Sequence, residues 1–331
     1  VFPDVVIQWE DFRKDNALSI LDRYNDQLPS FNDDIQGTGA VAVACVLAAS
    51  RINGIPFAEQ RILIYGAGAA GLGISRELRN QFSRQGVDGE TLRRAIVVMD
   101  SRGVVSDGRD KLDAYKKEMA VPEQYAQEMA LDDAGRKDLT SVVRGSKATV
   151  LIGASGQGGA FTEEVVKAMC KNVEQPVILP MSNPTAISEA KPENLLRWTE
   201  GMALVATGSP FDDVQMRGGA QRIGQANTVF IFPGLGLGTI VSGATRVTSE
   251  MISASANALA ESLTGDELQS RCLMPAVSRL WEICEHVGLA VAAQAVADGV
   301  AQSLDDIEQR LRDYRWLPEY PEFIEGDIDV V

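Results

Sequence analysis

"RILIYGAGAAGLG", residues 61 to 73, decides the fold, because it joins an apolar strand-like run to a glycine-rich turn and the start of a helix. Its glycines form the pattern G-x-G-x-x-G, in which the first permits a tight turn, the second lets the backbone approach a pyrophosphate, and the third lets helix and strand pack. The helix N-terminus then faces the anion. The stretch predicts a dinucleotide site, with a βα turn that binds no ligand as the alternative. The turn residues expected to line it are Gly66, Ala67, Gly68, Ala69, Ala70 and Gly71.

The same alternation of strand-like and helical segments continues along the chain. Short apolar runs recur as "VVIQW", "AIVVMD", "ATVLIGA", "VILPMS", "ALVATG" and "VFIFPG". Strands that are buried on both faces read as continuous apolar runs, so the pattern predicts an α/β fold with a doubly wound, mostly parallel sheet. Ala-rich helical patterns after residue 240 predict additional C-terminal helices. We therefore expect an acid-bearing lead-in segment at 1–50, a Rossmann-type dinucleotide domain at 51–240, and helices with an aromatic tail at 241–331.

Composition narrows the class of protein. The 331 residues carry 31 basic and 46 acidic side chains, a formal charge of −15, which argues against nucleic-acid and anionic-membrane partners. Four cysteines without C-x-x-C spacing predict neither a disulfide framework nor a thiolate metal site, and favour a reduced, cytoplasmic compartment. No uninterrupted apolar run of 18 residues or basic leader is present, so we expect neither a membrane span nor a signal peptide. The sequence begins at Val1 inside a strand-like run, which predicts a piece of a longer chain.

Carboxylates stand out as candidate chemical groups. The one histidine, His286, lies in a helical pattern and is expected to be structural or solvent-facing. Asp33 and Asp34 are adjacent in "FNDDIQGTGA", and Glu10 and Asp11 follow "VVIQW". Beside an apolar wall such acids raise each other's pKa unless a cation lies between them. Hard oxygens suit Mg²⁺ or Mn²⁺, while solvated helix caps are the alternative.

The end of the next predicted strand indicates the nucleotide. Asp100 closes "AIVVMD", where an acid would bind a ribose diol, although it lies further from Gly71 than the usual ~20 residues. The inserted segment "QFSRQGVDGETLRR" accounts for the difference. Ser101, Arg102 and Lys117 are placed to neutralise a 2′-phosphate, or are ordinary surface residues. The choice between NAD and NADP therefore stays open.

Two amides follow later strand-like runs. Asn183 lies in "MSNPT" and Asn227 in "GQANTVFIFPG". Ligands of open α/β sheets lie outside the carboxyl ends of the strands, which places Asn183 in particular at the predicted cleft. Uncharged amides there suit a nicotinamide carboxamide or a substrate carboxylate.

Taken in order, the unusual strings of residues 5 to 240 resemble the malic enzymes and the related malolactic enzymes. They are "IQWEDF", "FNDDIQGTGAVAVA", "IYGAGAAGLGI", "VMDSRG", "TEEVV", "MSNPT", "ALVATGSPF" and "QANTVFIFPGLGLG". The resemblance implies an oxidoreductase that converts malate to pyruvate and CO₂ with NAD(P) and a divalent metal. It implies Glu10, Asp11 and Asp34 as metal ligands and Asp33 as a neighbouring proton-relay candidate. Asn183 and Asn227 would line the substrate and nicotinamide pocket.

The comparison also implies two departures. The family's catalytic lysine and tyrosine, and an arginine that holds malate, belong to an upstream domain that this chain does not contain. Thr228 stands where many relatives carry a second asparagine, which bears on the preference for malate. Malolactic chemistry and a non-catalytic dinucleotide-binding module are the alternatives. The Ala-rich helices and aromatic tail also make a homo-oligomer the expected assembly.

Overall fold

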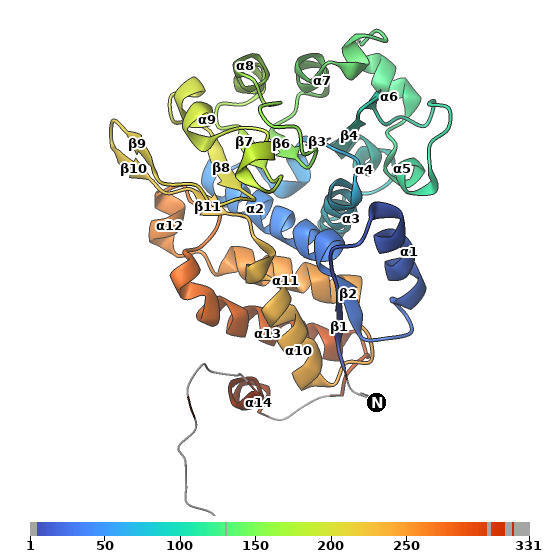
Figure 1. The fold of residues 1–331 in the computed structure, drawn as a ribbon, viewed down its shortest axis with the longest axis vertical. Helices are drawn as coiled ribbons and strands as arrows, with labels where there is room; N and C mark the ends of the chain where they lie inside the picture. The colour runs from blue at the N-terminus through green and yellow to red at the C-terminus, as the bar shows by residue number, and fades with distance from the viewer. Residues whose placement is uncertain (1–4, 130, 303–305, 315–319, 321–331) are drawn as a thin grey trace, which may run out of the picture.

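The structure is a computed structural model that describes residues 5–129, 131–302, 306–314 and 320. A seven-stranded sheet with the order β11-β8-β7-β6-β3-β4-β5 forms its centre (Figure 1). The strands are β3 (Ile62–Tyr65), β4 (Ile96–Asp100), β5 (Gly103–Val104), β6 (Val150–Gly153), β7 (Val177–Pro180), β8 (Leu204–Thr207) and β11 (Gly224–Gln225). All neighbours pair in parallel except β4 and β5. The predicted doubly wound sheet is confirmed, and its order reverses between β3 and β6.

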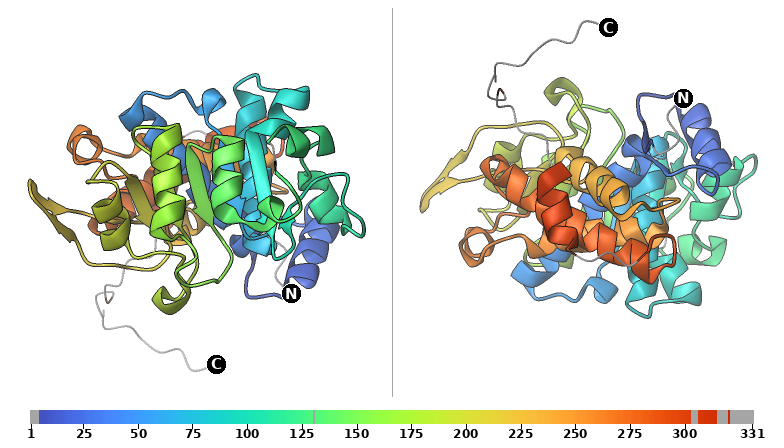
Figure 2. Two further views of the ribbon diagram at one scale, coloured as in Figure 1. Left: turned by 90° about the horizontal axis from the view of Figure 1, so that it is seen from above. Right: turned by 90° about the horizontal axis from the view of Figure 1, so that it is seen from below.

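Helices cover both faces of this sheet, which explains the continuous apolar runs (Figure 2). In β3, Ile62 and Ile64 join the core beneath α2 and α3, whereas Leu63 joins the core of the other face. The first face carries α2 (Thr38–Asn53) and α3 (Ala69–Arg84), against which α11 (Ser249–Glu261) packs from outside, and the second carries α7 (Leu139–Ser146), α8 (Glu163–Asn172) and α9 (Pro192–Trp198). Every residue of such a strand therefore contacts apolar side chains on one side or the other.

The C-terminal helices form a further layer below α2 and α3 (Figure 1). This layer contains α10 (Phe232–Ser242), α11, α12 (Gly265–Gln269), α13 (Leu280–Ala297) and α14 (Ile307–Tyr314). The run "VFIFPG" is not the predicted strand, because residues Thr228–Phe230 form a 3₁₀ turn and α10 begins at Phe232. The aromatic tail lies outside the described residues, apart from Tyr314 and Tyr320.

Helix α2 is the central helix of the fold. It continues a short π-helix, η1 (Asp33–Gly37), and the combined stretch Asp33–Asn53 is long and apolar enough to cross a membrane by length and composition. Most of its apolar window is buried inside the fold, against α3 and α11. Its apolar residues therefore belong to the protein core, which the lead-in segment shares with the sheet.

Shorter elements complete the chain. A separate two-stranded parallel sheet pairs β1 (Ile7–Trp9) with β2 (Ser30–Asn32), and α1 (Lys14–Tyr24) connects them. The others are α4 (Gly89–Ala95), α5 (Ala114–Met119), α6 (Glu123–Glu128) and the hairpin of β9 (Val214–Met216) and β10 (Gly219–Gln221). All four cysteines are free, and His286 on α13 is exposed and shares a hydrogen bond with Ser262, as expected for a structural histidine.

Candidate active site

A cavity of about 350 Å³ opens near the carboxyl ends of β6 and β7. It is lined by Glu10, Asp33, Asp34, Thr38, Ala70, Ile74, Ala154, Met181, Ser182, Asn183, Ala226, Asn227 and Thr228. Both predicted amides, three of the four predicted acids and one residue of the glycine turn thus meet in one place. Asp11 is not among the lining residues. The cavity adjoins the switch point between β3 and β6, where ligands of doubly wound sheets bind.

The glycine turn has the backbone geometry that dinucleotide binding requires. Gly66 adopts a φ of +127°, and a Cβ there would lie 2.2 Å from the carbonyl oxygen of Ala154. A Cβ on Gly71 would lie 1.9 Å from the carbonyl oxygen of Gly66, so strand and helix pack directly. Beside Gly68, the residue before α3, there is open space. The free amides at the start of α3 are therefore accessible to an anion.

The pairing of β1 with β2 brings the acids together, since Glu10 follows β1 and Asp33 follows β2. The backbone N–H of Asp11 donates to Oδ2 of Asp34 over 2.8 Å. Asp11 itself adopts a left-handed φ of 62°, which is uncommon for a residue other than glycine. Asp33 and Asp34 lie in a π-helical turn, a conformation that often marks functional sites.

Asp33 is the most perturbed of these acids. Its side chain is buried, its Oδ2 accepts a 2.7 Å hydrogen bond from Oγ1 of Thr228, and its Oδ1 has no partner among the described residues. Burial raises the pKa of Asp33 to about 6; the Thr228 bond lowers it, and the charges of Glu10 and Asp34 raise it further. Thr228, singled out in the sequence as a departure from the family pattern, thus holds Asp33 in place.

The donor set fits a hard divalent cation in its chemistry. Asp33, with a buried carboxylate oxygen that has no partner, shares the cavity with two further carboxylates, and among the described residues no Lys or Arg lines it. Within the described ranges, however, no three His, Cys, Asp or Glu side chains form a ready ligand cluster. Mg²⁺ is commonly bound by one or two carboxylates with water and substrate in the other positions, so an incomplete protein set suits it.

Asp100 lies at the end of β4, as predicted, but its carboxylate is already engaged. Arg109 donates to both oxygens over 3.0 and 3.1 Å, and Nζ of Lys116 lies 2.7 Å from Oδ2. The backbone N–H of Arg102 adds a bond of 2.8 Å. Sequence reasoning named Lys117 and missed both Arg109 and Lys116. Asp100 is thus paired with two cations. We expect its carboxylate to have two roles, to orient Arg109 and Lys116 and to bind a ribose.

This ion-pair network predicts a pH dependence. Burial raises the pKa of Asp100, but the bonds from Arg109, Lys116 and Arg102 outweigh it and lower the pKa from 3.8 to about 2. A depressed pKa stabilises the fold above pH 4 and loses that contribution as the pH falls toward 2. Asp100→Asn should lower the unfolding free energy by about 1 to 2 kcal/mol near pH 6. Urea unfolding should show this deficit shrinking toward pH 3, and a deficit that does not vary with pH would contradict the assignment.

The two amides keep donors free for a ligand. Oδ1 of Asn183 accepts a hydrogen bond from Oγ of Ser209 over 2.5 Å, and Oδ1 of Asn227 accepts from the N–H of Val229 over 2.9 Å. These bonds fix the orientation of each amide. The described residues give neither Nδ2 group a partner, so both can donate to a carboxylate or carboxamide oxygen.

Glu189 is a residue of this region that the sequence did not reveal. It is fully buried, and its Oε1 accepts bonds from the N–H and Oγ of Ser155 at 2.9 and 2.8 Å and from Oγ of Ser182 at 2.6 Å. Ser155 follows β6, and Ser182 precedes Asn183 after β7. One carboxyl group therefore joins two loops of the cleft.

Comparisons with known proteins identify the family of the chain. The family model described as "Malic enzyme, NAD binding domain" matches residues 35–296. NAD-dependent malic enzyme 3 of Bacillus subtilis is 44% identical over 96% of this chain and 56% of its own length. The NAD-dependent malic enzyme of Psychrobacter cryohalolentis is 38% identical over 97% of this chain and 58% of its own. The chain thus spans a little more than half of these curated relatives.

Solved structures show the same similarity. The malic enzyme of Entamoeba histolytica superimposes with a TM-score of 0.74 at 26% identity, covering 93% of this chain and 58% of that one. The NAD-dependent malic enzyme of Thermotoga maritima gives a TM-score of 0.67 at 26% identity, covering 87% and 66%.

Proposed function

The chain belongs to the malic enzyme family, and on that premise we propose that it is the cofactor- and metal-binding part of an NAD-dependent enzyme that converts malate to pyruvate and CO₂. The observation that carries the proposal is the shared cavity. There Asp33, whose Oδ1 is buried without a partner among the described residues, lines the same space as Asn183 and Asn227, next to the glycine turn. A βα turn that binds no ligand would not require acids and amides to gather around one cavity beside it.

Each residue has a task in this reaction. When bound, NAD would supply the hydride acceptor for this oxidation, and a divalent cation would supply Lewis-acid stabilisation of negative charge on the substrate. Glu10 and Asp34 would hold the cation, with Asp11 supporting Asp34 through its backbone N–H. Asn183 and Asn227 would orient the nicotinamide and a substrate carboxylate through their Nδ2 groups. Asp33, whose pKa is about 6, can hold or release a proton at Oδ1.

We favour NAD over NADP. The two curated relatives reported above are named NAD-dependent. Arg109 and Lys116, the cations nearest to Asp100, are both paired with its carboxylate, which reduces their attraction for a 2′-phosphate. A homo-oligomeric assembly and a cytoplasmic location stay predictions.

Calorimetric titration of the 331-residue chain with NAD⁺ and with NADP⁺, each with and without Mn²⁺, tests the proposal. We expect saturable NAD⁺ binding that Mn²⁺ tightens, and weaker NADP⁺ binding. Asp34→Ala should retain NAD⁺ binding but lose the effect of Mn²⁺. Asp15→Ala removes an exposed carboxylate of α1 away from the cavity and should behave like the parent chain.

The outcomes separate the two parts of the proposal. A folded chain that binds neither nucleotide would refute the dinucleotide site. An Mn²⁺ effect that persists in Asp34→Ala would move the metal site elsewhere, without changing the conclusion on NAD.

A further inference from the structure

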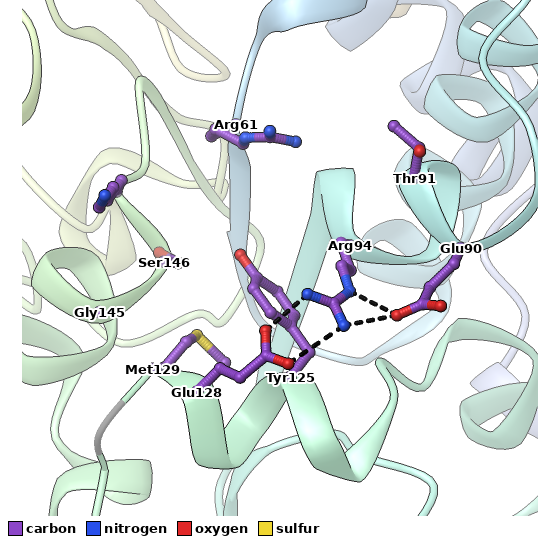
Figure 3. A pocket seen from close by; sticks show the side chains of 10 residues that line it. Arg61, Glu90, Thr91, Arg94, Tyr125, Glu128, Met129, Gly145 and Ser146 are labelled. Carbon is purple, nitrogen blue, oxygen red and sulfur yellow. Dashed lines mark hydrogen bonds and ion pairs between the residues drawn. The ribbon is translucent and has the colours of Figure 1, made fainter.

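A second cavity, of about 540 Å³, lies near the amino end of β3 and is drawn in Figure 3. It is lined by Arg61, Glu90, Thr91, Arg94, Tyr125, Glu128, Met129, Gly145, Ser146 and Lys147. Arg61 directly precedes β3, whereas the glycine turn directly follows that strand. The length of β3 therefore separates this cavity from the dinucleotide cleft, and the proposed function does not use it.

The charges of this cavity are unbalanced. Arg94 donates to Glu128 over 2.6 Å and to Glu90 over 2.8 Å, so it occupies both carboxylates of the lining. Arg61 and Lys147 are exposed, and within the part of the chain that the structure describes neither has a carboxylate partner. In a chain with a formal charge of −15, two unpaired cations at one cavity create a local site for an anion.

Tyr125 adds a directed donor. Its ring is partly buried, with the Arg94 guanidinium 5.1 Å from the ring centroid, and its hydroxyl has no hydrogen-bond partner among the described residues. Figure 3 shows this hydroxyl turned toward the side of the cavity on which Arg61 lies. Burial raises the pKa of Tyr125, while the charges of Arg61 and Arg94 lower it, so the phenol lies within the field of both cations.

The walls are held in place without a ligand. The Arg94–Glu128 ion pair joins α4 to α6, and Gly145 packs so closely on the end of α6 that a Cβ would lie 2.7 Å from the carbonyl oxygen of Met129. Lys147 ends α7 in a left-handed conformation, with φ at 53°. A preformed cavity of this kind loses little conformational entropy when a ligand binds.

We propose that this cavity binds a small organic dianion, in which a phosphate or a pair of carboxylates meets Arg61, Lys147 and the Tyr125 hydroxyl. The volume lies within the range of about 300 to 1,000 Å³ typical of small-molecule sites. A guanidinium can bind two acidic oxygens at once, and an ammonium adds a further point charge. The inference is independent of the proposed function, because none of these residues lines the dinucleotide cleft.

Isothermal titration with inorganic phosphate and with succinate, at constant ionic strength and with saturating NAD⁺, tests the proposal and distinguishes the two anion sources. NAD⁺ is included to occupy the helix N-terminus of the other cleft. We expect saturable binding of at least one probe, weakened at least about tenfold in the double variant Arg61→Ala, Lys147→Ala. Tyr125→Phe, which keeps the ring, should weaken it by about threefold.

The matched control is the double variant Arg84→Ala, Lys171→Ala. It removes the same two charges from exposed positions on α3 and α8 and should leave binding unchanged. Equal weakening in both double variants would show a general charge effect and overturn the proposal. Absence of saturable binding for both probes would overturn it as well, whether or not NAD⁺ binds.

Discussion

Replacing Gly66 with alanine should abolish measurable NAD⁺ binding by the chain. The new Cβ would lie 2.2 Å from the carbonyl oxygen of Ala154, closer than any normal contact, and a φ of +127° is strained for alanine. Relief of the clash must move the loop after β6 away from the glycine turn. We expect NAD⁺ affinity to fall at least about a hundredfold, since a displacement of about 1 Å at a binding site has effects of this size.

Two further glycine variants show whether the loss arises at the site. Gly86→Ala places alanine at a φ of +80° with no heavy atom within 4 Å of its Cβ, so it also introduces alanine at a positive φ but without the clash. It should cost about 1 kcal/mol of stability and leave NAD⁺ binding intact.

Gly68→Ala also meets no protein atom within 4 Å and should leave the fold intact. Because its methyl group enters the space expected for the pyrophosphate, NAD⁺ binding should still fall; unchanged affinity in Gly68→Ala would contradict a dinucleotide at this turn.

The sheet and the glycine turn could be predicted because their signals are local. A run such as "RILIYG" carries its strand, its turn and its two-sided burial within a few residues. "VFIFPG" carries the same apolar signal yet enters α10, because short apolar runs do not distinguish a strand from a buried helix. Pro233 lies in the first turn of α10, a position that proline favours, so this proline is the sequence signal that indicates a helix here and not a strand.

The contacts that tune the site could not be predicted, because they join distant parts of the chain. Thr228 and Asp33 are 195 residues apart in sequence, and only the path of the chain through η1 and the turn before α10 places them 2.7 Å from each other. Asp100 meets Arg109 and Lys116 through a loop and the short helix α5. Residue type alone does not distinguish Lys116 from Lys117, because adjacent lysines on a helix differ only in the direction in which their side chains point.

Glu189 supplies the second large effect. Glu189→Ala should lower the free energy of unfolding by about 2 to 4 kcal/mol, because it leaves partly buried donors without an acceptor and opens a cavity where a fully buried side chain lay. The donors affected are the N–H and Oγ of Ser155 and the Oγ of Ser182. Since Ser182 precedes Asn183, the variant should also lose NAD⁺ affinity by about tenfold or more, measured by calorimetry at a temperature where it remains folded.

Glu189→Gln separates positioning from mere packing. The amide oxygen can occupy the place of Oε1 and accept all three bonds, whereas its NH₂ group would face the N–H of Ser182, which lies 3.4 Å from Oε2. We therefore expect most of the stability and NAD⁺ affinity to return, to within about 1 kcal/mol of the parent chain. A matched loss of stability elsewhere in the core, from Leu259→Ala on α11, should leave NAD⁺ affinity unchanged. If Leu259→Ala reduces affinity as much as Glu189→Ala does, the effect reflects general destabilisation, and Glu189 does not position the two cleft loops.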